Sequence, residues 1–244
     1  MFKKTFSFFS ICILFVLFFS IRAIAQNTQG SDVKAKNIFA EKGKLKLGID
    51  VTAGSGLNKI TVGKTTDNED ITISGGGGVG VSAIIGYLLF DELETDLGIG
   101  VQNNTLSKKV ENAEGSFSKT ILTITPKYLI IIGNSNQINI GAGVGYYIPG
   151  DMDIDASKVT NGFHEVASYD PAVGFHVLAE YEGFFQAFSH LFSWSAGIKY
   201  TSVSFEAKSY KRNGVTHNVS TLKDDYRNLN GNSVNFIGEI KIHL

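Results

Sequence analysis

INIGAGVGYYI, residues Ile138 to Ile148, is the stretch that decides the fold. Aliphatic or aromatic side chains occupy every second position from Ile138, and the positions between them hold Asn139, three glycines and Tyr147. Successive side chains of a strand point to opposite faces, so this pattern predicts a strand with one apolar face. Its eleven residues match the roughly 9 to 11 residues that a tilted strand needs to cross a bilayer.

The same alternation recurs along the rest of the chain. Further strands are expected at residues 45–53, 79–89, 93–101, 117–130, 173–181, 192–200 and 234–244. The connections alternate between long and short, and 182–191 is interpreted as a medium aromatic turn. This rhythm is typical of a meander whose tight turns all lie at one end. The sequence therefore predicts an all-β fold, an eight-stranded antiparallel up-and-down transmembrane β-barrel with both of its ends on the tight-turn side.

Two positions disturb the alternation. Pro126 has no N–H to donate to a neighbouring strand, so a bulge or a local loss of pairing is expected there. Near Ser202 the pattern slips, because Val203 and Phe205 fall out of step with the preceding residues. We interpret the slip as a second bulge.

The N-terminal segment has the features of a secretory signal. Lys3 and Lys4 precede a mostly apolar run over residues 6–21, and Ala23-Ile24-Ala25 has the small-x-small pattern of a cleavage site. The alternative is a single transmembrane helix, but a run of ~16 residues falls below the usual spanning range of about 17 to 25. The polar residues that follow Ala25 also favour cleavage.

Composition narrows the functional classes. The only cysteine, Cys12, lies inside the apolar run, so it would leave with the signal and the mature chain would hold no disulfide and no thiol nucleophile. A formal net charge of −1 argues against a nucleic-acid partner. The glycine run 75–78 is not followed by the Lys-Ser or Lys-Thr of a phosphate-binding loop, so it is interpreted as a flexible junction. No cofactor is expected.

Alternation alone does not say whether the apolar face points into the barrel or out of it. A soluble, lipocalin-like barrel would turn that face inward around a ligand. The glycine-rich polar face favours the opposite orientation, because small residues suit the narrow lumen of a barrel of this size. Aromatic residues gather toward the strand ends, as expected at the two surfaces of a bilayer. The predicted lipid-interface aromatics are Tyr87, Tyr128, Tyr146, Tyr181, Trp194 and Tyr200.

Together these features resemble a known family. The signal-like N-terminus, the alternating strands, INIGAGVGYYI and a last strand ending in Ile240, Ile242 and Leu244 resemble the small outer-membrane β-barrel proteins of Gram-negative bacteria, the OmpW-like and OmpA-transmembrane-domain-like group. The resemblance implies export through a cleaved signal peptide and location in the outer membrane. It also implies contact with outer-membrane lipid and with the barrel-assembly machinery, for which the last strand is the signal. The expected organisation is a signal peptide at 1–25, a periplasmic linker at 26–43 and an outer-membrane β-barrel at 44–244.

The polar face of the predicted strands places charges of both signs in the lumen. Because ionised groups in a narrow, low-dielectric interior must pair, we expect a salt-bridge network that plugs the barrel. The same groups could instead line a narrow, porin-like conduit for small or hydrophobic solutes. The predicted members of the lumenal charge network are Lys46, Asp50, Glu94, Asp96, Lys127, Glu180, Lys199, Glu239 and Lys241.

Catalysis and metal binding have weak candidates. His190 and Ser193 are close in sequence, and outer-membrane lipid-modifying enzymes of this size exist, but the pair lies at the predicted tight-turn end, away from surface substrates. Asp151, Asp153 and Asp155 could offer oxygen ligands to a divalent cation, although the rest of a calcium motif is missing, which favours a solvated acidic loop. No catalytic residue and no metal ligand is therefore assigned. The expected function is non-enzymatic, with a structural or surface-interaction role and long loops open to an extracellular ligand.

Overall fold

The computed structural model describes residues 44–108, 110–132, 135–159 and 162–244. The predicted signal peptide at 1–25 and linker at 26–43 lie outside the described residues, so both stay predictions.

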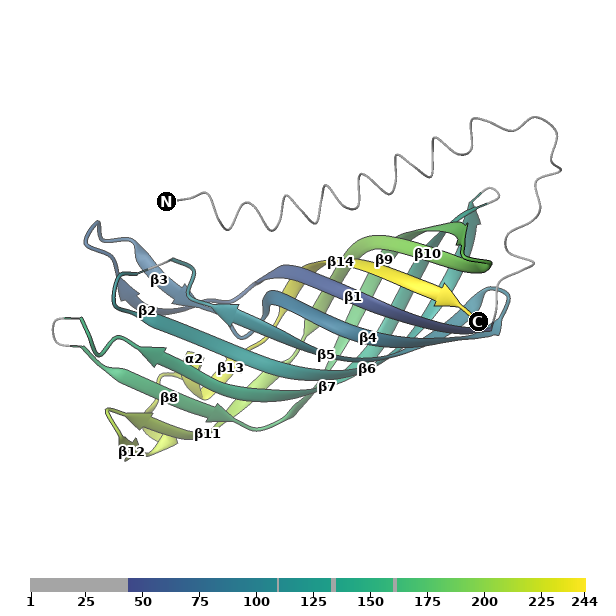
Figure 1. Ribbon diagram of the computed structural model, residues 1–244. Coiled ribbons are helices and arrows are strands. Elements are labelled where there is room, and N and C mark those ends of the chain that lie inside the picture. Colours follow the sequence, from purple (N-terminus) through teal and green to yellow (C-terminus); the bar gives the residue numbers. More distant parts are fainter. Residues whose placement is uncertain (1–43, 109, 133–134, 160–161) are drawn as a thin grey trace. The chain divides into compact units, whose positions relative to one another are not determined.

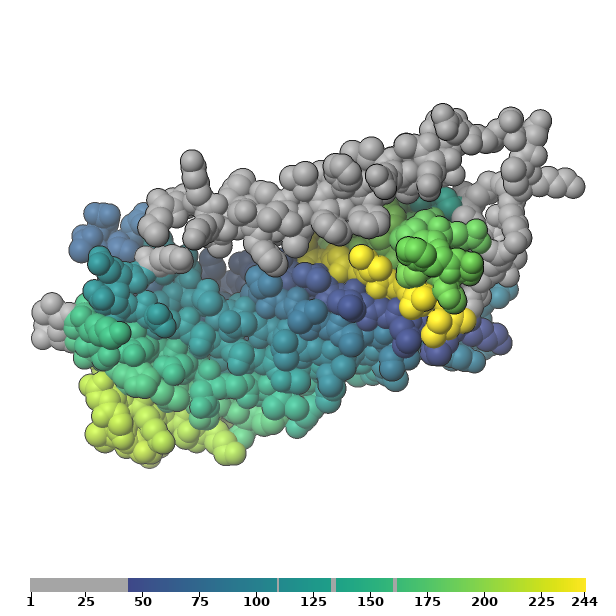
Figure 2. Space-filling model, viewed as in Figure 1, coloured from purple at the N-terminus to yellow at the C-terminus, as the bar shows by residue number. Residues whose placement is uncertain are grey.

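Eight long strands form a closed antiparallel barrel, which confirms the predicted fold. They are β1 (Leu45–Gly56), β4 (Gly77–Phe90), β5 (Leu93–Thr105), β6 (Glu114–Ile132), β7 (Asn136–Asp155), β9 (Ala172–Ala187), β10 (His190–Ser202) and β14 (Ser233–His243). Each pairs with the next in chain order, and β14 closes the barrel on β1, where Ile240 lies opposite Ile49. The two closing strands run side by side along the wall, as Figure 2 shows in purple and yellow.

The tight turns lie at the end where the barrel begins and finishes. The N–H of Leu244 donates to the carbonyl of Leu45 at 2.9 Å. The predicted medium turn at 182–191 is wrong, because β9 continues to Ala187 and only two residues turn the chain. Phe188 and Ser189 both have positive φ, 50° and 64°, the backbone twist that suits a two-residue hairpin.

The opposite end of the barrel carries additional secondary structure, since three of the long connections are folded. Their elements are β2 (Ile60–Lys64), β3 (Asp70–Ile73), β8 (His164–Tyr169), β11 (Ser204–Arg212), β12 (Val215–His217), the 3-10 helix η2 (Val219–Thr221), α2 (Asp224–Arg227) and β13 (Asn228–Asn230). The outer ends of β6 and β7 continue into this region, where β8 pairs with β7 and β11 pairs with β8 (Figure 1).

No helix in the described part of the chain combines the length and the apolar character needed to cross a membrane.

The disturbance at Pro126 is a loss of pairing without a bulge. On the β7 side the ladder stops after Ile124 and resumes at Lys127 in the same register, while on the β5 side Pro126 stays opposite Thr95. The second expectation, a bulge near Ser202, is wrong. β10 ends at Ser202 and β11 starts at Ser204, because the chain leaves the barrel wall there to pair with β8.

A bulge that the sequence did not reveal lies farther along β7. Phe117 of β6 faces Met152 and Lys119 faces Pro149, so β7 carries one extra residue between these two pairs. Below the bulge, even-numbered residues such as Ile148 are exposed on the outer wall, and above it the even-numbered Met152 and Ile154 are buried. The extra residue exchanges the two faces of the strand.

Aliphatic side chains cover the outside of the barrel wall. In the INIGAGVGYYI stretch, Ile140 and Val144 are 51% and 52% exposed, whereas Asn139 is 0% exposed. The apolar face therefore points outward, and the alternative of an inward apolar face is excluded. Among the predicted interface aromatics, Trp194 packs against Tyr181 with ring centroids 5.7 Å apart, and Tyr200 packs against Phe175 at 6.4 Å. Their contact with lipid stays a prediction.

Candidate lumenal site

The inner half of the lumen, toward the tight turns, is filled by charged side chains from five strands. At its centre the Lys127 Nζ lies 2.8 Å from Asp96 Oδ2, 2.8 Å from Glu180 Oε2 and 3.8 Å from Glu239 Oε1. These partners come from β5, β9 and β14, so one lysine of β6 joins four strands across the axis.

Two further lysines complete this arrangement. Lys46 pairs with Glu94 and lies 4.0 Å from Glu182 Oε1. The Lys241 Nζ is 2.5 Å from Glu239 Oε2 and 3.7 Å from Asp96 Oδ2. None of these residues is more than 5% exposed. We call the set the inner ion network, and its members are Lys46, Glu94, Asp96, Lys127, Glu180, Glu182, Glu239 and Lys241.

Glycines on the polar face make room for these long side chains. A Cβ on Gly48 would lie 2.7 Å from the Lys241 Cγ, and one on Gly86 would lie 2.6 Å from Asp96 Oδ1. Both distances are shorter than side-chain packing permits. At these two positions the glycine leaves the space that a charged side chain of the adjacent strand occupies.

The sequence reasoning missed Glu182, which the structure places in the network with 0% exposure. Its carboxylate accepts hydrogen bonds from Gln137 at 2.6 Å, Asn139 at 2.8 Å and Ser193 at 2.5 Å. The misplaced turn at 182–191 hid this residue. Period-two alternation beyond Glu180 was the signal that could have found it, since Glu182 continues the polar face by one step.

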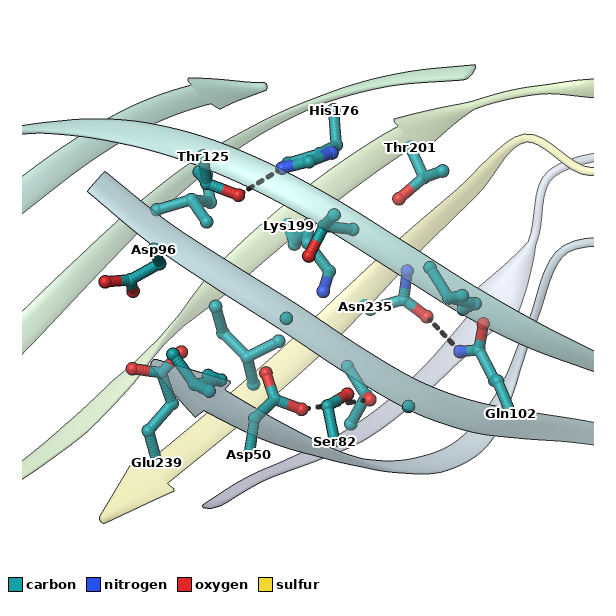
Figure 3. Close-up of a pocket in the computed structure, with 18 of the residues that line it drawn as sticks. Asp50, Ser82, Asp96, Gln102, Thr125, His176, Lys199, Thr201, Asn235 and Glu239 are labelled. Atoms are coloured by element: carbon teal, nitrogen blue, oxygen red, sulfur yellow. Dashed lines mark hydrogen bonds between the residues drawn. The ribbon is translucent and has the colours of Figure 1, made fainter. Parts of the chain in front are cut away.

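Two predicted members of the network lie elsewhere. Asp50 and Lys199 line a polar cavity of about 50 Å³ on the outer side of the inner ion network (Figure 3). Asp50 accepts a hydrogen bond from Thr52 at 3.3 Å, and neither Asp50 nor Lys199 has an oppositely charged side-chain atom within 4.0 Å among the described residues. We call this cavity the lumenal chamber. His176, another chamber residue, shares a 2.8 Å hydrogen bond with Thr125.

Apolar side chains close the lumen above the chamber. Phe205 packs edge to face against the rings of Phe117 and Tyr147, and Phe117 packs in the same way against Tyr169. The ring centroids lie 5.8 to 6.5 Å apart. We call the group the mouth cluster, and it comprises Ile60, Ile73, Phe117, Tyr147, Met152, Ile154, Ala167, Tyr169, Val203, Phe205, Tyr210 and Leu229. Tyr147 also lines the chamber, so the two features share a boundary.

The segment 74–76 folds inward beside the mouth cluster. Lys119 donates to the Gly75 carbonyl at 2.8 Å, and Asn104 donates to the carbonyls of Ser74 and Gly76, each at 2.9 Å. Immediately after this segment, Gly77 and Gly78 have φ of 74° and 92°, a backbone conformation that residues with a side chain rarely adopt. The glycine run is thus the bend that returns this connection to the barrel wall.

The candidate catalytic pair is separated by the fold. His190 is exposed, and Ser193 points into the lumen with 0% exposure. The histidine that approaches Ser193 is His243, whose Nε2 lies 3.0 Å from the serine hydroxyl oxygen, and Ser193 itself donates to Glu182. Serine, histidine and carboxylate therefore meet, but the hydroxyl has no accessible face for a substrate.

The aspartates proposed as cation ligands lie on the exposed outer end of β7. Asp153 is 2.9 Å from His164 Nε2, and Asp155 accepts from the Ser157 N–H at 2.9 Å. Hydrogen bonds from the side chain and the backbone N–H of Ser157 lower the pKa of the Asp155 carboxyl. Among the residues that the structure describes, no group of three or more His, Cys, Asp and Glu side chains could hold a metal ion.

Comparison with known proteins supports the fold. No protein-family model and no curated protein sequence matches this chain. Among solved structures, the outer membrane protein OprG from Pseudomonas aeruginosa is 16% identical, covering 83% of this chain and 98% of its own, with a TM-score of 0.52. Neisserial surface protein A is 10% identical with coverage of 82% and 97% and a TM-score of 0.47, and AlkL, solved in lipid bilayers, is 12% identical with coverage of 88% and 94% and a TM-score of 0.43. The likeness to OprG confirms that the chain has the fold of small outer-membrane β-barrel proteins.

Proposed function

We propose that this chain is an integral outer-membrane β-barrel protein without enzymatic activity, which has a structural or surface-interaction role and a lumen plugged by the inner ion network. The observation that carries the proposal is the pairing of charges across the axis: eight ionisable residues, none more than 5% exposed, meet in the inner half of the lumen.

The outward aliphatic band supports the membrane location. Soluble proteins rarely expose a continuous apolar surface larger than a few hundred Å². Here exposed aliphatic side chains recur on every barrel strand, for example Ile49, Val81, Ile99 and Val144. A bilayer is the solvent in which such a wall is stable, because the closed barrel leaves no backbone edge unpaired. The proposed partners are outer-membrane lipid around the wall and the barrel-assembly machinery at β14, and nucleic acid is not among them.

The energetics of buried ion pairs support the plug. Eight strands leave an interior just wide enough for side chains to fill. Breaking a buried pair by removing one partner typically costs about 3–5 kcal/mol, because the remaining charge stays uncompensated. A water-filled path through the network would separate several such pairs at once. The folded outer connections remain the surface that an extracellular ligand would meet.

The lumenal chamber favours a second candidate function, a narrow porin-like conduit. A cavity between the network and the mouth cluster is a step on any route through the barrel. A third candidate, an outer-membrane lipid-modifying enzyme, has only the buried contact of Ser193 with His243 in its favour. Hydrolysis of a lipid ester that is lost in Ser193→Ala would contradict the non-enzymatic proposal.

The deciding experiment is conductance of the purified full chain in planar bilayers. The wild-type protein should show no steady openings, and a Lys127→Gln/Glu180→Gln variant, which removes the central pair and leaves the net charge of the inner ion network unchanged, should open more often. Lys223→Gln, a change at an exposed residue outside the lumen, is the matched control and should behave as wild type. Steady, ion-selective openings of the wild type would refute the plug. Membrane fractionation and heat-modifiable migration on a gel test the location and the barrel independently.

A further inference from the structure

Two lysines beside the lumenal chamber lack the carboxylate partners that the inner lysines have. Lys119 is 4% exposed, and its ammonium group donates to the Gly75 carbonyl. Lys199 extends its amino group into the middle of the chamber, between Asp50 and Asn235 (Figure 3). In the described part of the chain, neither ammonium nitrogen has a carboxylate oxygen within 4.0 Å.

The charges of the lumen are unevenly distributed along its axis. The inner ion network holds three lysines and five carboxylates, an excess of two negative charges. Around the chamber, the charge of Lys199 disfavours positive charge on Lys119 and on His176. Of the carboxylates that line the chamber, Asp50 alone lies outside the inner ion network. The other two carboxylates that line the chamber, Asp96 and Glu239, already pair with Lys127 and Lys241.

An excess of ammonium groups in a largely buried site is costly, and of the two lysines Lys119 is buried while Lys199 is partly exposed. A buried charge is stable when it is paired and hydrogen-bonded, and two like charges raise the cost of each other. Asp50 offsets one positive charge, and the second has no carboxylate of its own in the chamber, because Asp96 and Glu239 pair with Lys127 and Lys241. A cation would add to the imbalance, and an anion would remove it. Hydroxyl groups of Ser82, Thr123 and Thr201 also line the chamber and offer donors to an anion.

The size of the chamber limits the class of anion. One water molecule needs about 10–15 Å³ of such space, so a cavity of about 50 Å³ holds only a few water-sized groups. Sugars, peptides and organic phosphates are too large. A monatomic anion fits with one or two waters beside it.

We propose that the lumenal chamber is a binding site for a small monovalent inorganic anion of the size of chloride, held by Lys199 with Lys119 on its outer side. The anion neutralises the lysines, and the negatively charged inner ion network keeps it from moving farther along the axis. Bound there, it stabilises the contact of Lys119 with Gly75, by which the inward-folded segment 74–76 is fixed to β6.

Thermal unfolding in a non-ionic detergent tests the site. Sodium chloride is compared with sodium gluconate at equal concentration, so the ionic strength is the same in both. Of the two anions, only chloride is small enough for the chamber. Because a ligand that binds the folded state alone stabilises it by mass action, the wild-type Tm should be higher in chloride, by on the order of 2–4 °C at saturation. Lys199→Gln should remove the difference, and the exposed-site control Lys223→Gln should keep it.

Asp50→Asn supplies an independent arm that does not depend on the folding of the lysine variant. It removes the carboxylate that competes for Lys199, so it should enlarge the chloride effect. Equal Tm values in the two salts for wild type and Asp50→Asn would overturn the inference, as would an undiminished chloride effect in Lys199→Gln. The result is separable from the plug, since steady openings in planar bilayers would refute the plug and leave the chloride shift unchanged.

Discussion

The inner lumen and the mouth are two parts of one interior with opposite chemistry. Inward-pointing side chains form the inner ion network at one end, and at the other they form the mouth cluster around Phe205. The outer surfaces are inverted in the same way: Val144 is exposed on the wall beside the network, and Asp151 and Asp153 are exposed on the same strand beside the mouth.

The difference shows what the surroundings demand of each half. Where lipid is the outer solvent, apolar side chains are stable on the outside and the interior is free to be polar, provided that its charges pair. In the proposed membrane location the connections lie beyond the lipid in water, where they need an ordinary apolar core to hold their shape. β7 serves both halves because its bulge exchanges the faces between Ile148 and Met152.

The largest expected effect comes from breaking the inner half at its centre. Lys127→Met removes the charge that Asp96, Glu180 and Glu239 share, so we expect the free energy of unfolding to fall by about 3–5 kcal/mol. Urea titration in detergent micelles, followed by gel migration, measures it. Adding Glu180→Gln should restore part of the loss. If Lys127→Met alone is as stable as wild type, the inner ion network does not stabilise the folded protein.

The mouth cluster should lose stability for a different reason, the loss of side-chain packing. Phe205→Ala empties a site that is 0% exposed and touches Phe117 and Tyr147, at a cost of about 3 kcal/mol. We expect the loss to be local, with faster amide hydrogen exchange in β8 and β11 and unchanged protection in β5. Phe236→Ala, on the outer wall, is the matched control. Faster exchange throughout the barrel in Phe205→Ala would mean that the two halves unfold together.

A charge placed along β7 sharpens the comparison of the outer surfaces. Val144→Lys places an ammonium on the exposed apolar wall that we propose faces lipid, so we expect a loss of about 2 kcal/mol in the free energy of unfolding from lipid vesicles. Asp151→Lys, on the exposed outer end of the same strand, should change it little. Equal losses in the two variants would contradict the proposed change of solvent between the two positions.

The smallest effect is expected at the surface of the mouth. Lys208 lies 4.0 Å from Asp170 and both side chains are mostly exposed, so Lys208→Gln should change stability by less than about 0.5 kcal/mol. Thermal unfolding at low and high salt measures the change. A larger, salt-dependent loss would mean that ion pairs stabilise the mouth as well as the inner lumen.

The barrel strands were predictable because their signal is local and repeated. Alternation identifies each of them, and an unpaired apolar face over so many strands has few stable solutions. The connections were less predictable. Residues 164–169 and 204–212 form strands that pair with each other although they belong to different connections, and no local pattern encodes such a pairing. Val203 and Phe205 gave a signal, the slip in alternation, but its meaning depended on a sheet that the sequence did not reveal.

The lumenal charges, too, were predictable only in part from local sequence, and the rest depended on the tertiary structure. Parity along each strand placed Lys127, Glu180 and Lys241 in the lumen, because period two fixes which face a side chain takes. Their depth along the axis depends on the register of neighbouring strands. The register places Lys199 opposite Asn235, away from the paired charges, whereas Asp50 lies directly opposite Glu239 and is distinguished only by its side-chain contacts in the chamber.

The sequence by itself determined the number of barrel strands, their antiparallel order and the residues that share a face, because these follow from a period of two and from the positions of the turns. The tertiary structure decided what each face meets. In β7 the even positions are apolar on both sides of the bulge, so the pattern continues unbroken while Ile148 points outward and Met152 points inward. One extra residue in β7, relative to β6, reverses the faces. The bulge is defined only by the pairing of the two strands, so the sequence of β7 alone does not reveal it.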